Sequence, residues 1–439
     1  MPLKIIHIIP GSGGSFYCGN CLRDSKYFDG LRRMGHDVAK VPMYLPLFSD
    51  EHDISDVPVF YGAISIYLKQ LYPVFRKAPG WFDKLLNSKP MLKLAASMAG
   101  STRAKGLEDM TISMLQGEKG KQHEELDRMT DWMRDHFKPD VIHLSNALLL
   151  GLAKTMKEKL RVPVVCTLQD EDTWVDVMSD PNRHKVWELM SENAGYVDRF
   201  ISVSEYFKGV ALEKMTIAPE KIITLHIGVD PADYTFRNSI EKKRTIGFIS
   251  RMSHENGLDI LVDAFLLLKK QPAYDDVQLI VTGGQTGDDT KFLKKVRDTI
   301  RNTGYVSSVD FHKDFEGEGR QEFFTKASVI SVPVRHGEAF GIYIAESMAS
   351  GIPVVQPALG AFPEILEKTG GGIIYDENTP EKLSLALREL LDNRPRLEKM
   401  STDARIGAEQ HLNIHELAKG LVNVYEEVQL SGRRSAVVD

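Results

Sequence analysis

Two glutamates, Glu338 and Glu346, frame the stretch HGEAFGIYIAE at residues 336–346. Ionised carboxylates are the strongest side-chain acceptors for the hydroxyls of a sugar. If a helix begins near Phe340, its first backbone N–H groups suit a diphosphate, and Gly341 lets a ligand approach the backbone. The stretch therefore predicts part of a site for a sugar joined to a diphosphate. The same spacing is also typical of a surface turn followed by a helix with two solvated glutamates.

A glycine-rich turn near the amino end offers a second place for an anion. The apolar run Lys4–Ile9 predicts a buried parallel strand, which PGSGGS (residues 10–15), a helix to about residue 34 and a strand over 38–44 follow. This order is the opening of a nucleotide-binding βαβ unit. Gly13 and Gly14 would let the backbone approach an anionic ligand. The alternative is a tight turn without a ligand.

The bulk properties favour a cytoplasmic enzyme. The chain has 439 residues, which suggests two domains of roughly 200 residues each. A formal net charge of -6 argues against a nucleic-acid-binding protein. No apolar run reaches membrane-spanning length, and residues 1–10 lack the features of a signal peptide. Three cysteines, an odd number, do not suggest a secreted disulfide framework.

Strand-like and helix-like segments alternate in two series separated by a polar linker at about 231–243. The alternation predicts two parallel sheets with covered faces, and active groups at the carboxyl ends of the strands. Two successive α/β domains imply a ligand cleft between them. After 4–9 and 38–44, the predicted strands are 140–144, 162–168, 200–204, 221–230, 245–251, 277–284, 309–312, 329–332, 354–355 and 373–374. The predicted divisions are 1–234, 235–410, a helix over 411–432 and a tail over 433–439.

Residues from about 45 to 122 interrupt the alternation. They are rich in aromatic side chains and then in helix formers, and we interpret them as an insertion in the first domain that shapes one wall of the cleft. Such aromatic residues more often form core than a platform for a sugar. A weak peripheral membrane association through Tyr67 to Lys89 is an open alternative, although no strongly basic amphipathic helix is present there.

Cys18 and Cys21 form a C-x-x-C motif just after the first strand. A redox or metal site would need a second pair or a thioredoxin-like unit, and Cys166 is the one further cysteine. We therefore expect free thiols here.

A series of motifs occurs in a fixed order along nearly the whole chain, and the insertion after Tyr44 matches least. The motifs are Gly13-Gly14, Gly35-His36-Asp37-Val38, Thr167-Leu168-Gln169-Asp170, Val203-Ser204-Glu205, Gly228-Val229-Asp230, Ser250-Arg251 with Gly257, Gly283-Gly284, Glu338 to Glu346, Ser350 to Val355, and Gly360 with Pro363-Glu364. Together they resemble the retaining GT-B glycosyltransferases of the family 4 type, the group 1 glycosyl transferases.

The resemblance implies two Rossmann-like domains facing a cleft, a C-terminal helix that crosses back, and a sugar-nucleotide donor. It implies no cofactor and no metal in the chemistry, and it leaves a glycan, a lipid or a small molecule open as the acceptor. By the resemblance, Glu338 would bind the donor sugar, Glu346 the ribose and Arg251 the diphosphate. Gln169 and Asp170 complete the implied catalytic set. The other implied donor-binding residues are Gly13, Gly14, Ser250, Asn256, Gly283, Phe340, Gly341 and Ile342.

Three positions depart from the family pattern. Asn256 stands where a lysine is usual, Gln169 replaces a histidine, and Ser347 replaces an alanine. The first two motivate an alternative function, a catalytically weakened protein that binds sugar nucleotides or glycans. A sugar-nucleotide epimerase is a further alternative on the same fold. Asp170-Glu171-Asp172 resembles the metal-binding D-x-D of a different transferase fold, and we interpret it as an acidic helix start with Asp170 alone facing the site.

Overall fold

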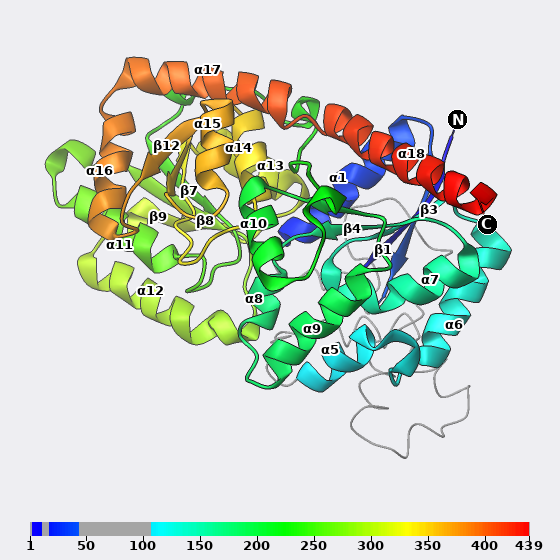
Figure 1. Ribbon diagram of the computed structural model, residues 1–439. Helices are drawn as coiled ribbons and strands as arrows, with labels where there is room; N and C mark the ends of the chain where they lie inside the picture. Colours follow the sequence, from blue (N-terminus) through cyan, green and yellow to red (C-terminus); the bar gives the residue numbers. More distant parts are fainter. Residues whose placement is uncertain (1, 11–16, 44–106, 439) are drawn as a thin grey trace. The chain divides into compact units, whose positions relative to one another are not determined.

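The computed structural model describes residues 2–10, 17–43 and 107–438 (Figure 1). The chain divides into two compact units, each built on a parallel sheet. The first unit contains residues 1–13, 27–225 and 418–439, and the second contains residues 14–26 and 226–417. No helix among the described residues combines the length and the apolar character needed to cross a bilayer.

The sheet of the first unit has the strand order β2-β1-β3-β4-β5-β6, and all of its neighbouring strands are parallel. Its strands are β1 (Lys4–Ile9), β2 (Asp37–Pro42), β3 (Val141–Leu144), β4 (Val164–Leu168), β5 (Arg199–Ser202) and β6 (Ile222–Thr224). The apolar run predicted as the first strand forms β1 with the same bounds. Every β1 residue after Lys4 is buried, as a strand covered on both faces requires.

The helices of the first unit follow the strands, as the alternation predicted. They are the later part of α1 (Gly19–Arg33), α5 (Glu108–Leu115), α6 (His123–Trp132), α7 (Ala153–Leu160), α8 (Glu171–Val175), α9 (Asn182–Ala194) and α10 (Glu205–Lys214). The part of the predicted insertion at 107–122 contains α5. The rest of the insertion, including Tyr67 to Lys89, lies outside the described residues.

The sheet of the second unit has the strand order β12-β11-β10-β7-β8-β9, again with parallel neighbours. Its strands are β7 (Thr245–Ile249), β8 (Gln278–Thr282), β9 (Val309–Phe311), β10 (Val329–Ile330), β11 (Val354–Pro357) and β12 (Gly372–Tyr375). The order reverses between β7 and β10, because the strands after β7 are added on one side and those from β10 onward on the other. Such a reversal is the place where doubly wound sheets bind ligands.

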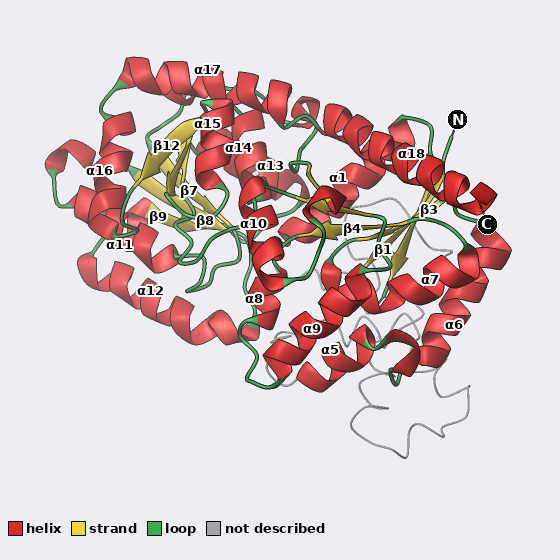
Figure 2. Cartoon of the chain, viewed as in Figure 1, coloured by secondary structure: helices red, strands yellow, loops and turns green. Residues whose placement is uncertain are grey.

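Helices surround this second sheet (Figure 2). Helix α11 packs against α12 and α16, while α17 packs against α14 and α15. The bounds are α11 (Leu258–Lys269), α12 (Thr290–Thr303), α13 (Gly317–Lys326), α14 (Ile342–Ala349), α15 (Phe362–Thr369), α16 (Pro380–Leu391) and α17 (Arg394–His411). The two Rossmann-like domains predicted from the sequence are therefore confirmed.

The last helix, α18 (Ile414–Val438), begins in the second unit and belongs to the first unit from Ala418 onward. Its Tyr425 hydroxyl lies 2.6 Å from Nδ1 of His143 on β3, and the other ring nitrogen of His143 lies 2.7 Å from Thr167 Oγ1 on β4. This contact ties the helix to the first sheet, so the predicted return of the C-terminal helix is confirmed. The helix continues to Val438, past the end predicted at residue 432.

Candidate functional site

The predicted donor-binding residues of the second unit lie at the carboxyl ends of β7 and β10, the two strands that flank the reversal. Ser250 and Arg251 directly follow β7, and the loop that carries Glu338 and Gly341 connects β10 to α14. The carboxyl ends of parallel neighbours meet at one edge of the sheet. The topology therefore brings together groups that the sequence separates by more than eighty positions.

Backbone contacts with the Gly360 turn hold Glu338. Gly360 has a φ of +58°, and a Cβ atom added to it would lie 2.4 Å from both the backbone N and O of Glu338. The Ala361 N–H donates to the Glu338 carbonyl at 3.0 Å. Only glycine permits this approach, because a Cβ would clash with backbone atoms that have no freedom to move. The half-buried Glu338 side chain is thus carried by a fixed main chain.

Helix α14 starts at Ile342, close to the start predicted near Phe340. Gly341 is its N-cap, with a φ of +80°, and the Tyr343 ring lies 3.0 Å from where a Cβ would stand. The first N–H groups of a helix have no acceptor within the helix, which makes them available to an anion. The side chains of Phe340 and Ile342 are buried, so these two residues can offer a ligand only their backbone.

Glu346 lies inside the second unit rather than at its surface, with 1% of the residue exposed. Its Oε2 accepts a hydrogen bond from the Tyr17 hydroxyl, and its Oε1 accepts one from Tyr234 at 2.7 Å. Arg320 Nε of α13 lies 3.6 Å from Oε1. Burial, followed by the charge of Glu346, raises the pKa of both tyrosines well above the ordinary value. Both phenols therefore stay protonated and act as donors to a buried carboxylate.

Arg405 of α17 fixes the chain around Tyr234. Its Nη1 donates to the carbonyls of Pro231, Tyr234 and Ala349 at 2.9, 3.2 and 2.5 Å. Ala349 is the last residue of α14, the helix that carries Glu346. One guanidinium thus joins the end of α14 to the segment that supplies a partner of Glu346.

Arg251 is bound by an acidic partner that the sequence interpretation did not identify. Its Nε and Nη2 donate to the two carboxylate oxygens of Asp289, each at 2.9 Å, and Nη2 also donates to Thr286 Oγ1 at 2.9 Å. Burial alone would raise the pKa of Asp289, but the bonds from Arg251 and Thr286 outweigh burial and lower it. Arg251 is held in a fixed direction. Its positive charge would be shared between Asp289 and a bound diphosphate.

Asn256 and Gly283 support the turn after β7. Asn256 Nδ2 donates to Ser250 Oγ at 2.8 Å and to the Arg251 carbonyl at 2.9 Å. Gly283 has a φ of +122°, and a Cβ there would lie 2.0 Å from the Ser250 carbonyl oxygen. The carbonyl of Gly283 accepts from the backbone N–H of Tyr17 at 2.8 Å. Asn256 therefore holds the turn through two hydrogen bonds from its amide group, and a longer lysine side chain would not make both of them in this geometry.

Gln169 and Asp170 belong to the first unit, where they follow β4. Asp170 has a φ of +60° and is the N-cap of α8, the short helix that starts at Glu171. Glu171 is buried, and its carboxylate accepts from the backbone N–H groups of Gln169 at 2.9 Å and Ala147 at 2.8 Å. The acidic cluster thus begins a helix, as predicted, and Glu171 orders the main chain of Gln169.

The buried carboxyl of Glu171 gives a pH-dependent prediction. Burial raises its pKa to about 7, above the 4.5 of an exposed glutamate. The protonated form is therefore favoured in the folded state. The stability that this group contributes is complete below pH 4.5 and is lost as the pH rises through about 7. Between pH 5 and pH 8, the free energy of unfolding of the first unit should rise by about 2.5 kcal/mol in Glu171→Gln relative to the wild type.

Urea unfolding followed by tryptophan fluorescence measures this difference, because all four tryptophans lie in the sequence of the first unit. Glutamine keeps one oxygen acceptor and never ionises, so any bond that it loses affects both pH values alike. Equal differences between variant and wild type at pH 5 and pH 8 would contradict the prediction.

Cys18 and Cys21 form a disulfide at the start of α1. The expectation of free thiols was therefore wrong for this pair, whereas Cys166 is free and buried. A spacing of three residues places the two side chains on the same side of the first helical turn, with the Cα atoms 5.4 Å apart. The disulfide follows directly after Tyr17.

Comparison with known proteins agrees with this geometry. Residues 232–406 match the family described as Glycosyl transferases group 1, and residues 117–233 match Glycosyltransferase Family 4. The chain belongs to the family 4 type of glycosyltransferases. The first match covers the whole of the second sheet with Arg251, Glu338 and Glu346, and the second match includes Gln169 and Asp170.

Individual relatives of this glycosyltransferase are distant. The lipopolysaccharide core biosynthesis mannosyltransferase LpsB of Rhizobium meliloti is 28% identical over 46% of this chain, and the alignment spans about half of that relative, 54% of its length. The D-inositol 3-phosphate glycosyltransferase of Acidothermus cellulolyticus is 24% identical over 69% of this chain and 70% of its own. The crystal structure of Anabaena Alr3699/HepE in complex with UDP is similar over 97% of this chain and all of that chain, with a TM-score of 0.67 and 16% identity. This similarity supports the GT-B fold.

Several residues of the site were not predicted from the sequence of this glycosyltransferase. They are the partners of predicted residues, and each comes from a distant part of the chain. Tyr17 and Tyr234 bond Glu346, Arg320 lies beside it, and Asp289 holds Arg251. The position of Tyr17, two residues after the predicted glycine-rich turn at 10–15, was the local signal available. Gly13 and Gly14 themselves lie outside the described residues.

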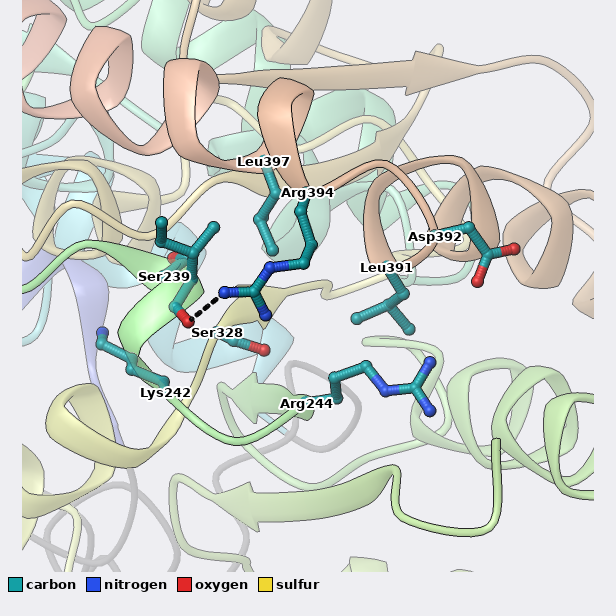
Figure 3. Close-up of a pocket in the computed structure, with 9 residues that line it drawn as sticks. Ser239, Lys242, Arg244, Ser328, Leu391, Asp392, Arg394 and Leu397 are labelled. Carbon is teal, nitrogen blue, oxygen red and sulfur yellow. Dashed lines mark hydrogen bonds between the residues drawn. The ribbon is translucent and has the colours of Figure 1, made fainter. Parts of the chain in front are cut away.

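A pocket of about 360 Å³ lies elsewhere in the second unit, near the amino ends of β7 and β10 (Figure 3). Its lining residues are Ser239, Ile240, Lys242, Arg244, Ser328, Leu391, Asp392, Arg394 and Leu397. Lys242 Nζ donates to the carbonyls of Phe324 and Ala327, each at 3.0 Å, at the end of α13, and Arg244 is paired with Asp276. These cations already have structural partners, and ligands of such sheets bind at the carboxyl ends. This pocket therefore lies at the edge of the sheet opposite the predicted donor-binding residues.

Proposed function

We propose that this glycosyltransferase moves a glycosyl unit from a sugar nucleotide to an acceptor with retention of the anomeric configuration. The observation that supports the proposal best is the arrangement around the strand reversal of the second sheet. A fixed arginine follows β7, and the loop after β10 carries a carboxylate and leads into a helix N-terminus. These groups suit a diphosphate and a sugar, the two parts of such a donor. The structurally similar HepE forms a complex with UDP, which supports a sugar nucleotide as donor.

In the proposed mechanism, the bond from the anomeric carbon to the leaving diphosphate breaks as a bond to the acceptor oxygen forms on the same face. The acceptor proton passes to the leaving phosphate oxygen, so the products are the new glycoside and a nucleoside diphosphate. Arg251 and the N–H groups at the start of α14 stabilise the negative charge that grows on the phosphate. Glu338 binds sugar hydroxyls and faces the positive charge that develops at the anomeric carbon.

A donor panel tests this function. Purified protein is incubated with UDP-, GDP- and ADP-sugars and with glycan, lipid and small-molecule acceptors, and the release of nucleoside diphosphate and the anomeric configuration of the product are measured. Transfer with retention that Glu338→Ala abolishes supports the proposal. An inverted product would overturn the retention step, and tight donor binding without turnover would favour the second candidate function below.

The second candidate function is a protein that binds sugar nucleotides and has weakened catalysis. Two observations favour it: Asn256 supplies no charge, and Arg251 shares its charge with Asp289. A partly neutralised arginine is a weak match for a diphosphate of charge near two.

Asn256→Lys distinguishes the two candidates. We expect the substitution to lower kcat/KM about thirtyfold, because the two hydrogen bonds to Ser250 and the Arg251 carbonyl are worth about 1 kcal/mol each and are lost. Steady-state kinetics measures the effect. Asn256→Leu is the matched control, since it removes the same donor without adding a charge. A rise in kcat/KM for the lysine variant would contradict the prediction and would indicate a site weakened by the missing charge.

A further inference from the structure

The two oxygens of Glu346 have partners of different origin. Oε1 is bonded by Tyr234 at 2.7 Å and lies 3.6 Å from Arg320, and both residues belong to the continuous stretch 226–417 that forms the sheet and helices of the second unit. Oε2 is bonded by Tyr17, which belongs to the short segment 14–26. This segment, here called the added segment, includes the first turns of α1 from Gly19 onward. One oxygen is therefore held by the unit itself and the other by an added segment.

Tyr17 and Gly19 of the added segment lie against the turn after β8 and the first residue of α14. The Tyr17 N–H donates to the Gly283 carbonyl at 2.8 Å, and a Cβ added to Gly19 would lie 3.5 Å from Cγ2 of Ile342, the first residue of α14. The disulfide between Cys18 and Cys21 closes the first turn of α1, directly after Tyr17. The Tyr17 phenol thus stands at Glu346, the carboxylate that the family resemblance gives to the ribose, and Gly19 lies beside the first residue of the helix whose N-terminus the proposed function gives to the diphosphate.

A phenol and a ribose hydroxyl make the same kind of bond to a carboxylate. Each donates one O–H to an ionised oxygen, and such charge-assisted bonds are short and strong. Glu346 is buried with its oxygens already bonded, so a ribose hydroxyl can reach Oε2 only by taking the place of another donor. Tyr234 has the backbone support of Arg405, whereas Tyr17 lies on the separate segment. Tyr17 is therefore the partner that exchanges.

We propose that Tyr17 occupies the ribose-hydroxyl position of Glu346 and leaves it when a nucleoside diphosphate sugar binds. Tyr17 would then determine how much the ribose hydroxyls contribute to the affinity for the donor. The inference rests on the proposed sugar-nucleotide function and adds a specificity-determining residue to it. Its consequence is an exchange of one hydrogen bond for another. The gain from the ribose hydroxyl is largely offset by the loss of the tyrosine bond.

Isothermal titration calorimetry of the full chain tests the exchange. Wild type, Tyr17→Phe and Tyr234→Phe are titrated with UDP, GDP and ADP, and then with the 2′,3′-dideoxy form of the nucleotide that binds best. The quantity compared is the ratio of the dideoxy Kd to the ribo Kd. We expect a ratio within about threefold of one for the wild type, because one bond replaces another. For Tyr17→Phe we expect a ratio of about tenfold or more, because the ribose bond is then gained without a loss.

Tyr234→Phe is the matched control, since it removes a phenol from the other oxygen of the same carboxylate and should leave the ratio within about twofold of the wild type. A thermal melt of each variant verifies that it is folded. The same ratio in Tyr17→Phe and wild type would overturn the exchange and leave the proposed function standing. An equal rise of the Kd ratio in Tyr17→Phe and Tyr234→Phe would also overturn it, because the loss of either phenol would then have the same effect on ribose binding. Failure of every nucleotide to bind the wild type would reject the proposed function together with the inference.

Discussion

Replacing Arg251 with methionine is expected to lower kcat/KM for glycosyl transfer by about 10²- to 10³-fold, the usual loss when a fixed donor to a developing oxyanion is removed. The structure supplies the reason why this guanidinium is effective. Asp289 binds it through two bonds of 2.9 Å and Thr286 through a third, so its orientation is fixed before the donor arrives. A cation whose orientation is fixed in advance loses little conformational entropy when the donor binds. It can therefore stabilise the negative charge on the phosphate as that charge grows. Steady-state kinetics with the best donor of the panel measures the loss.

Arg251→Lys separates the charge from its orientation. Lysine keeps the positive charge but lacks the planar fork that pairs with both oxygens of Asp289, so most of the activity should still be lost. Arg301→Met is the matched control, because it removes an arginine from the exposed end of α12, where its partner is Asp298. Its kcat/KM should stay within about twofold of the wild type, the range of an exposed ion pair. Full activity in Arg251→Met would mean that the diphosphate binds elsewhere.

The sheets could be predicted from the sequence because their strands are short apolar runs between turn residues. The run at 4–9 forms β1 with the predicted bounds, and the run at 245–251 contains β7. Glycine turns were also informative where the backbone requires them. Gly341 caps α14 with a positive φ, and Gly360 permits the close approach to Glu338. These features depend on residues close together in the sequence, and local physical chemistry determines them.

The partners of the site residues could not be predicted in the same way. Tyr17 and Glu346 are 329 positions apart, and Tyr234 and Glu346 are 112 positions apart. Neither tyrosine belongs to a pattern with Glu346, and the contacts depend on how segments pack. The disulfide shows a related difficulty. The lack of a second cysteine pair argued for free thiols, whereas the helical start of α1 brings Cys18 and Cys21 together.

These partners change the interpretation of the 336–346 stretch. The sequence suggested two glutamates with similar tasks at a ligand, but their surroundings differ. Glu346 is a buried carboxylate in a network of two tyrosines and Arg320. Glu338 is half-buried on a loop whose main chain the Gly360 turn fixes. Under the proposed function, Glu346 would support nucleotide recognition, whereas Glu338 would contact the sugar and take part in the chemistry.

Glu338→Gln is expected to lower kcat/KM about 10²-fold while the Kd for the free nucleoside diphosphate stays within about twofold of the wild type. Glutamine has nearly the same shape and still accepts one hydrogen bond. It lacks the negative charge that strengthens bonds to the sugar hydroxyls and that opposes the positive charge of the transition state. Kinetics measures the first quantity, and calorimetry with the nucleoside diphosphate measures the second.

The separation of the two quantities is decisive, because the nucleoside diphosphate lacks the sugar that Glu338 is proposed to touch. A general disturbance of the loop would also reach the N-terminus of α14, since Gly341 lies three residues beyond Glu338, and it would weaken nucleotide binding as well. A parallel loss of transfer and of nucleotide affinity would therefore assign Glu338 a structural task. Glu367→Gln, an exposed substitution on α15, is the control for the loss of one carboxylate charge, and neither quantity should change. If transfer were unaffected by Glu338→Gln, the sugar would not be bound by this carboxylate.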